Sequence, residues 1–231
     1  SPYGEQCREL FGVPEGWFLM GCDLSGIELR LLASYLAPYD GGEYARQVVD
    51  GDVHTFNAKA FGVDRKTSKS VIYSMIFGGG DRLIGSVAGG NAAKGKKLKA
   101  DFDAGVPAFA TLKKNLKTAF KRGYIKALDQ RRLPIRSEHR CLSQLLQSAG
   151  AIVAKQWVMT TYDQIKQKHG DDTYIVGWIH DEIQVACRTE DIAHDVGRIA
   201  CRMAEEAGVT LGLNVSTAAE YKVGRNWLST H

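Results

Sequence analysis

Several features that would define a class of protein are missing from this 231-residue sequence. No apolar run is long enough to span a bilayer, and the first residues lack the pattern of a signal peptide. There are also no internal repeats, low-complexity tracts or flexible linkers. We therefore expect neither a membrane partner nor a repeat or disordered architecture.

Paired cysteines are missing as well. The five cysteines are scattered, and none of them forms a C-x-x-C pair: Cys7, Cys22, Cys141, Cys187 and Cys201. A disulfide framework or a zinc site is therefore not expected. The expected compartment is a reducing cytoplasm.

The composition is that of a globular protein with a real hydrophobic core. The chain is 44% hydrophobic, 24% charged and 9% aromatic. Its length fits one large domain or two modest ones. A net charge of +4 permits a nucleic-acid partner without requiring one.

Two acidic positions stand at the ends of expected strands. The apolar run Trp17–Cys22 predicts a buried strand that ends at Asp23, just before a helical pattern. Two β-rich runs flank His180-Asp181-Glu182, which predicts a hairpin with a polar tip. Carboxylates brought together in this way can bridge two divalent cations about 3.5–4 Å apart. The alternative is that Asp23 is simply a helix N-terminal residue and Asp181 a turn residue.

A second group of candidate residues recurs at every fourth position. Arg65, Lys69, Tyr73 and Phe77 are expected to line one face of a helix. The cations suit a triphosphate, and the aromatic rings suit stacking on a base or sugar. The alternative is a solvated basic turn followed by an aromatic core stripe. His54 could donate to a phosphate, although a lone histidine is more often structural.

The remaining patterns are mostly helical. Tyr39–Gly123 reads as helices broken by glycines, and Ile125–Arg136 as a basic turn between short strands. Leu142–Thr161 predicts a long helix, and a last helix is expected over about Asp191–Ala207. The middle of the chain is therefore interpreted as an insertion between two halves of one sheet-based domain.

Three of these motifs, in this order, resemble the catalytic motifs of family A (Pol I-type) DNA polymerases. They are Asp23-Leu24-Ser25-Gly26-Ile27-Glu28-Leu29-Arg30, then Arg65-x-x-x-Lys69-x-x-x-Tyr73 with Phe77-Gly78, and then His180-Asp181-Glu182. Gly51-Asp52-Val53-His54-Thr55 and Leu145–Ala151 match as well. Within the family, the likeness is greatest to the replicative polymerases of T-odd phages, and it extends to Asn226-Trp227 and His231.

The resemblance implies an α/β (α+β) fold. A polymerase palm with a small antiparallel sheet would comprise residues 1–36 and 144–231. A mostly helical fingers subdomain, residues 37–143, would be inserted between them. The implied activity is template-directed DNA synthesis. Deoxynucleotides would pass from dNTPs to a primer 3′-hydroxyl, and pyrophosphate would be released.

The family also implies a role for each motif residue. Two Mg²⁺ ions would be held by Asp23, Asp181 and the backbone carbonyl of Leu24, and Glu182 would lie close to them. The incoming nucleotide would contact five side chains: Glu28, His54, Arg65, Lys69 and Tyr73. Of these, Glu28 would crowd the 2′ position, and Lys69 would act in catalysis by neutralising charge as pyrophosphate leaves. The DNA would be contacted by Gln147, His180 and Phe77.

Three positions depart from the family pattern. Ser74 stands where glycine is usual, Phe77 where tyrosine is usual, and Ser143 where asparagine is usual. None of them is a metal ligand. We therefore expect them to affect fidelity and not the type of reaction.

The resemblance further implies that the chain begins inside the palm. A second polypeptide would then supply the exonuclease, the thumb and the remaining palm, and Ser1 fits a split gene, proteolysis or intein excision. A phage-encoded chain would act in the host cytoplasm. Three other functions remain open at this point: a single-subunit RNA polymerase, a two-metal nuclease, and a non-catalytic or partner-dependent DNA-binding fragment.

Overall fold

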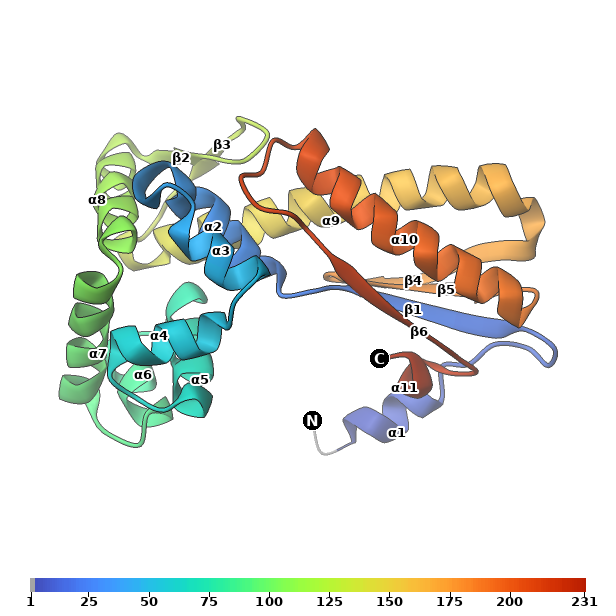
Figure 1. The fold of residues 1–231 in the computed structure, drawn as a ribbon, viewed down its shortest axis with the longest axis horizontal. Helices are drawn as coiled ribbons and strands as arrows, with labels where there is room; N and C mark the ends of the chain where they lie inside the picture. The colour runs from blue at the N-terminus through green and yellow to red at the C-terminus, as the bar shows by residue number, and fades with distance from the viewer. Residues whose placement is uncertain (1–2) are drawn as a thin grey trace. The chain divides into compact units, whose positions relative to one another are not determined.

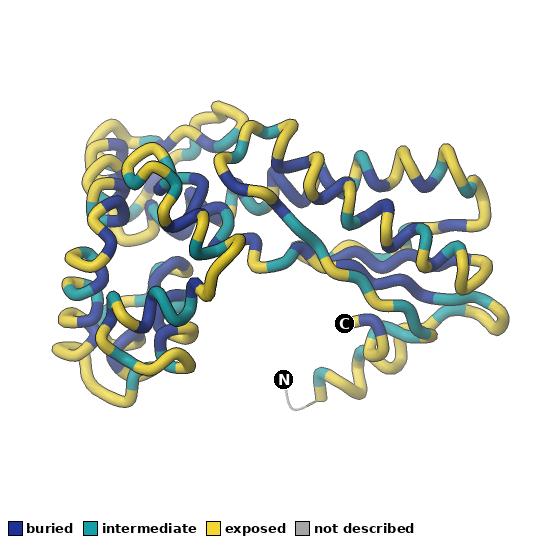
Figure 2. Tube along the Cα trace, in the orientation of Figure 1, coloured by how far each residue is buried: buried dark blue, intermediate teal, exposed yellow. Residues whose placement is uncertain are grey.

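The structure is a computed structural model that describes residues 3–231. The chain divides into two compact units. The sheet unit comprises the described residues up to Ile27 together with Gly150–His231, and the helical unit comprises Glu28–Ala149. Each unit has its own buried apolar residues (Figure 2).

The sheet unit contains one antiparallel sheet with the strand order β4-β5-β1-β6 (Figure 1). Its strands are β1 (Phe18–Leu24), β4 (Thr173–Ile179), β5 (Glu182–Cys187) and β6 (Ala219–Gly224). The inner strands β1 and β5 are buried over almost their whole length, and their residues are apolar except for Asp23, Glu182 and Gln184. The edge strands β4 and β6 alternate between more and less buried residues.

Helices cover both faces of this sheet. Helix α10 (Glu190–Thr210) packs against β1, β5 and β6, and Thr189 caps its N-terminus by accepting from Ile192 N at 3.3 Å. Helix α11 (Trp227–Thr230) packs against β1 and β6, and α1 (Gly4–Glu9) packs against α11. In Figure 1, α10 and α11 lie on opposite faces of the sheet.

The sheet unit also contains most of α9 (Cys141–His169) and the single turn η2 (Gly170–Asp172). The indole of Trp157 on α9 is fully buried and donates to the carbonyl of Ala200 on α10 at 2.8 Å. This hydrogen bond ties the two long helices of the unit together.

The helical unit is a series of short helices followed by a small hairpin. The helices are α2 (Ile27–Asp40), α3 (Glu43–Val49), α4 (Val53–Phe61), α5 (Arg65–Ile76), α6 (Asp81–Val87), α7 (Ala92–Gly105) and α8 (Pro107–Arg122). The hairpin is β2 (Tyr124–Lys126) with β3 (Arg132–Pro134), and it leads into η1 (Glu138–Arg140). Ile27, the first residue of α2, still belongs to the sheet unit.

Polar caps and an aromatic cluster explain these short helices. The side chains of Asp52, Asp64 and Asn91 accept backbone N–H groups at the starts of α4, α5 and α7. Phe102 is fully buried between Phe61, with ring centroids 4.5 Å apart, and Phe109, at 5.0 Å. These rings join α4, α7 and α8 in one core.

The structure confirms the predicted mixed fold with a small antiparallel sheet, including the hairpin around Asp181 and the basic turn between β2 and β3. The long helix predicted to end at Thr161 continues to His169. Strand β6 and helices α1 and α11 were not predicted. Within residues 3–231, no helix is both long and apolar enough to cross a membrane.

Candidate active site

Asp23 and Asp181 lie at the same end of two paired strands. Asp23 is the sixth residue of β1, and Asp181 directly precedes β5. The backbone N–H of Leu24 donates to the carbonyl of Asp181 at 3.0 Å, which joins the two segments. On the neighbouring strands, Asp23 has Glu182 and Glu220 as its register partners. Like charges placed opposite each other destabilise a sheet, so this strand end favours a cation.

The turn that carries Asp181 has an unusual backbone. Only two residues, His180 and Asp181, connect β4 to β5, and His180 has a φ of +56°. Left-handed backbone is costly for a residue other than glycine, and such positions cluster at functional sites. The indole of Trp178 donates to the carbonyl of His180 at 2.9 Å and so stabilises the turn.

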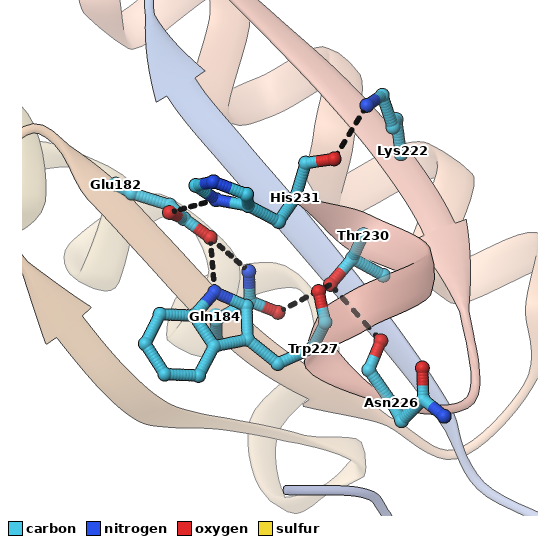
Figure 3. Close-up of polar contacts among 7 residues, drawn as sticks. All are labelled: Glu182, Gln184, Lys222, Asn226, Trp227, Thr230 and His231. Carbon is cyan, nitrogen blue, oxygen red and sulfur yellow. Dashed lines mark hydrogen bonds and ion pairs between the residues drawn. The ribbon is translucent and has the colours of Figure 1, made fainter. Parts of the chain in front are cut away.

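Glu182, the residue after Asp181, is buried and points toward α11 (Figure 3). Its carboxylate accepts hydrogen bonds from Gln184 Nε2 at 2.6 Å, Trp227 Nε1 at 2.7 Å and His231 Nδ1 at 2.8 Å. A cavity of about 450 Å³ lies beside Asp23 and Glu182 and is also lined by Lys222. The acidic strand end is therefore accessible, although Glu182 itself is enclosed.

In the helical unit, α5 presents the predicted face of cations and aromatic rings. Arg65 and Lys69 are exposed, whereas Tyr73 is half-buried. The ring of Tyr73 stacks with that of Phe77, the centroids lying 6.3 Å apart with an interplanar angle of 22°. His54 on α4 lies next to Tyr73, with a centroid distance of 6.3 Å.

Helices α4 and α5 are joined by polar contacts around Asp52. The Asp52 carboxylate caps α4 and also accepts from Arg65 Nε at 2.8 Å. This hydrogen bond with the Arg65 guanidinium is the main reason why the pKa of Asp52 lies well below its usual range. The hydroxyl of Ser68 donates to the carbonyl of His54 at 2.7 Å and so fixes the start of α4 against α5.

The surroundings of His54 lower its pKa. Partial burial lowers its pKa most, and the nearby charges of Lys69 and Arg65 lower it further. Its Nδ1 atom is buried without a hydrogen-bond partner among the described residues. These surroundings favour the neutral form of His54, and the imidazole lies beside two cations that would attract an anionic ligand.

Comparison with known proteins identifies the family. The model of DNA polymerase family A matches residues 1–229. The DNA-directed DNA polymerases of Enterobacteria phage T3 and Escherichia phage T7 are each 38% identical to this chain over 260 aligned residues, covering 100% of this chain and 37% of the relative. This chain belongs to DNA polymerase family A. It spans a little over a third of the length of these phage relatives.

The fold of this family A chain also matches a solved structure. The POL domain of Pol1 from M. smegmatis, in a complex with DNA primer-template and dNTP, has a TM-score of 0.82 and 20% sequence identity. The match covers 100% of this chain and 43% of that one. The resemblance first seen in the three motifs is thereby confirmed at the level of the family.

The predicted site residues of the family A chain fall into two groups, one in each unit. The sheet unit contains Asp23, Leu24, His180 and Asp181. The helical unit contains Glu28, His54, Arg65, Lys69, Tyr73, Phe77 and Gln147. Of the second group, His54, Arg65, Lys69, Tyr73 and Phe77 lie together on α4 and α5, Glu28 is in the first turn of α2, and Gln147 is exposed on α9.

The donor set at the strand end fits Mg²⁺. The described residues contain no group of three or more histidine, cysteine or acidic side chains that could enclose a metal ion. Mg²⁺ does not need such a group, because it usually takes one or two carboxylates and completes its shell with water and substrate phosphates. Asp23 and Asp181, with the hard oxygen of a backbone carbonyl, supply ligands of this kind.

Sequence reasoning missed the partners of Glu182. Trp227 and His231 lie on or directly after α11, which is a single helical turn, and Gln184 lies inside β5. The only signal that pointed to them was the extension of the family likeness to the end of the sequence, and it suggested no role.

Proposed function

We propose that this chain carries the palm and fingers of a DNA polymerase and performs template-directed nucleotidyl transfer. The primer 3′-oxygen would attack the α-phosphate of a dNTP, forming a new P–O bond as the bond between the α-phosphorus and the bridging oxygen breaks and pyrophosphate leaves. The observation that carries the proposal is the pair of aspartates joined by the Leu24–Asp181 hydrogen bond. Its support is the family and the 38% identity to phage DNA-directed DNA polymerases.

Asp23, Asp181 and the carbonyl of Leu24 would hold two Mg²⁺ ions. When bound, such ions make the attacking oxygen more nucleophilic and stabilise charge on the leaving oxygen. The chain's own contribution is to hold Asp23 on β1 beside the turn that carries Asp181 before substrate arrives, which would lower the cost of ordering the two carboxylates in the reaction.

The α4–α5 face would bind the triphosphate. Arg65 and Lys69 would neutralise the phosphate oxygens, and Lys69 would also stabilise the departing pyrophosphate. His54 would donate a hydrogen bond as a neutral imidazole, consistent with its lowered pKa. Because Arg65 is paired with Asp52, nucleotide binding would require the guanidinium to exchange or share that partner.

The remaining side chains would select the substrate and hold the DNA. Tyr73 would stack against the sugar and base of the nucleotide, and Glu28 would crowd its 2′ position. Phe77 would stack near the template base. His180 and Gln147 would lie at the primer terminus and the minor groove, where the acceptor atoms are common to all base pairs.

A second polypeptide that completes the palm is part of this proposal. The edge strand β4 exposes alternate apolar side chains, namely Tyr174, Val176 and Trp178. An exposed apolar edge strand attracts another strand or surface. We therefore expect this chain alone to be poorly soluble or inactive, and to gain activity with the partner.

The experiment is primer extension by the chain copurified with a partner that supplies the missing part of the palm. A labelled primer-template would be incubated with Mg²⁺ and with dNTPs, with rNTPs or with no nucleotide. Extension with dNTPs alone supports the proposal. Extension with rNTPs indicates an RNA polymerase, degradation without nucleotide indicates a nuclease, and DNA binding without any product indicates a non-catalytic fragment. Processive synthesis by the 231-residue chain by itself would contradict the partner requirement.

A further inference from the structure

Glu182 is a buried carboxylate whose hydrogen-bonding capacity is largely used. The residue is 5% exposed, and three donors contact its two oxygens within 2.8 Å (Figure 3). Burying a carboxylate is costly unless it is hydrogen-bonded, and these donors offset that cost. The side chain is therefore held in one orientation.

Two of the donors belong to one short segment. Trp227 and His231 are four residues apart at α11, so that they project from the same side of the turn. Trp227 donates to one oxygen of Glu182, and His231 donates to the other. We name this pair of contacts the Glu182 clamp.

The third donor is oriented by the same segment. The hydroxyl of Thr230, also on α11, donates to Gln184 Oε1 at 2.8 Å. This leaves the amide nitrogen of Gln184 facing Glu182. The orientation of every donor to Glu182 therefore depends on where α11 sits.

Several contacts seat α11 firmly on the sheet. Gly21 on β1 lies under it, and a Cβ there would collide with the carbonyl of Thr230. Phe11 packs edge-on against the Trp227 ring at 5.9 Å, and Arg8 lies over that ring at 5.4 Å. Lys222 on β6 donates to the carbonyl of His231 at 2.6 Å.

The clamp acts next to the proposed metal ligands. Glu182 follows Asp181 in sequence and is the register partner of Asp23 on β1. Cross-strand partners project from the same face of a sheet, so an unrestrained Glu182 carboxylate would be able to turn toward Asp23 and any cation bound there.

We propose that Trp227 and His231 are positioning residues for the polymerase reaction. They hold Glu182 against α11, keep it out of the metal coordination, and fix the turn that presents Asp181. This inference rests on the proposed function. Without the clamp, Glu182 would add a third carboxylate to the cation site. The site would then bind a cation more tightly, but the cation would be displaced from the position that the reaction needs.

The first test uses Trp227→Phe, which removes one donor and keeps an aromatic ring. In the complex with the partner chain, kcat should fall about tenfold, while the KM for dNTP stays within about twofold, because the lost hydrogen bond goes to a charged group and not to the nucleotide. Trp157→Phe is the matched control, since it removes an indole hydrogen bond elsewhere in the same unit. The control should lower the melting temperature but leave kcat within about twofold. Equal kcat losses in the two variants would overturn the proposal.

A double-mutant cycle removes the carboxylate itself. If the clamp acts only through Glu182, Trp227→Phe should have almost no further effect on kcat in a Glu182→Ala background. The paired variants His231→Asn and His231→Ala test whether the N–H donor at position 231 is what matters. Asparagine retains an N–H donor and should keep much of the activity that alanine loses. Fully additive losses, or equal losses for asparagine and alanine, would contradict the clamp.

A second readout does not depend on activity. Mn²⁺ binding is measured by electron paramagnetic resonance without DNA or nucleotide. Trp227→Phe should bind Mn²⁺ several-fold more tightly than the parent, and Glu182→Ala should abolish the difference. An unchanged Kd overturns the clamp even if the parent complex is an active polymerase. Conversely, a parent that extends no primer refutes the proposed function whatever the Mn²⁺ result.

Discussion

The two groups of candidate residues are held in different ways. In the sheet unit, the Asp181–Glu182 segment is fixed by backbone hydrogen bonds from the inner strand β1. The side chains of Gln184 and Trp227 also donate to the buried carboxylate of Glu182. In the helical unit, the Arg65–Asp52 pair is open to solvent, with the two side chains 58% and 45% exposed. Exposed ion pairs contribute little stability and are weakened by salt. The backbone that carries Asp181 is thus fixed by the fold, whereas the exposed Arg65 side chain can exchange its partner.

The largest expected effect concerns the two aspartates of the sheet unit. Asp23→Asn and Asp181→Asn should each reduce the rate of primer extension at least about a thousandfold, the scale of losing a main electrostatic element of a site. DNA affinity should change little, because phosphate contacts dominate it. The measurements are single-turnover extension and a DNA-binding titration. A rate within tenfold of the parent would show that these carboxylates do not hold the metals.

A smaller effect is expected on the α5 face. Tyr73→Phe keeps the ring that stacks with Phe77 but removes a hydroxyl. A dideoxynucleotide lacks the 3′-hydroxyl that can fold toward its own phosphates, and the Tyr73 hydroxyl would supply the missing hydrogen bond. An unpaired polar group costs about 1–3 kcal/mol, so dideoxynucleotide incorporation should fall about tenfold or more. The incorporation of dNTP should stay within a few-fold.

The readout for Tyr73 is the ratio of kcat/KM for dideoxynucleotide and dNTP, measured on the complex with the partner chain. If that ratio is the same in parent and variant, Tyr73 does not lie beside the nucleotide 3′ carbon. The assignment of the whole α5 face to the nucleotide would then be wrong.

The smallest effect concerns the exposed ion pair between Arg65 and Asp52. Asp52→Asn keeps an N-cap acceptor for α4 but removes the charge that competes for Arg65. The KM for dNTP should therefore fall about two- to fivefold, the range of an exposed ion pair, with kcat nearly unchanged. Because the pKa of Asp52 is depressed, its carboxylate stays charged in mildly acidic buffer, so lowering the pH to about 5 should not mimic the variant. A KM that rises would mean that Asp52 orients Arg65 for binding.

Local patterns in the sequence predicted the parts of the site that depend on local structure. The apolar run before Asp23 became β1, and the two runs around Asp181 became β4 and β5. The four-residue spacing of Arg65, Lys69 and Tyr73 placed all three on one face of α5. In each case, neighbours in sequence determine the periodicity, so it can be read without knowing the tertiary structure.

The clamp could not be predicted in the same way. Trp227 and His231 reach Glu182 across 45 and 49 residues of sequence. Helix α11 is only four residues long, which is too short to show a periodicity. Strand β6 before it is interrupted by the charged residues Glu220 and Lys222 and so lacks an apolar run. The pairing of Arg65 with Asp52 was missed for a related reason, since it joins two helices through side chains alone.

The close seating of α11 on Gly21 has a consequence for how the sequence can change. A side chain at position 21 would meet both Thr230 and the amide of Gln184, so any residue larger than glycine there requires smaller or displaced groups at 184 and 230. The Thr230 group that such a side chain would meet first is a backbone carbonyl, which no substitution at position 230 removes. Glycine is therefore required at position 21 for as long as α11 keeps its place on the sheet, and Gly21→Ala should displace the whole α11 segment.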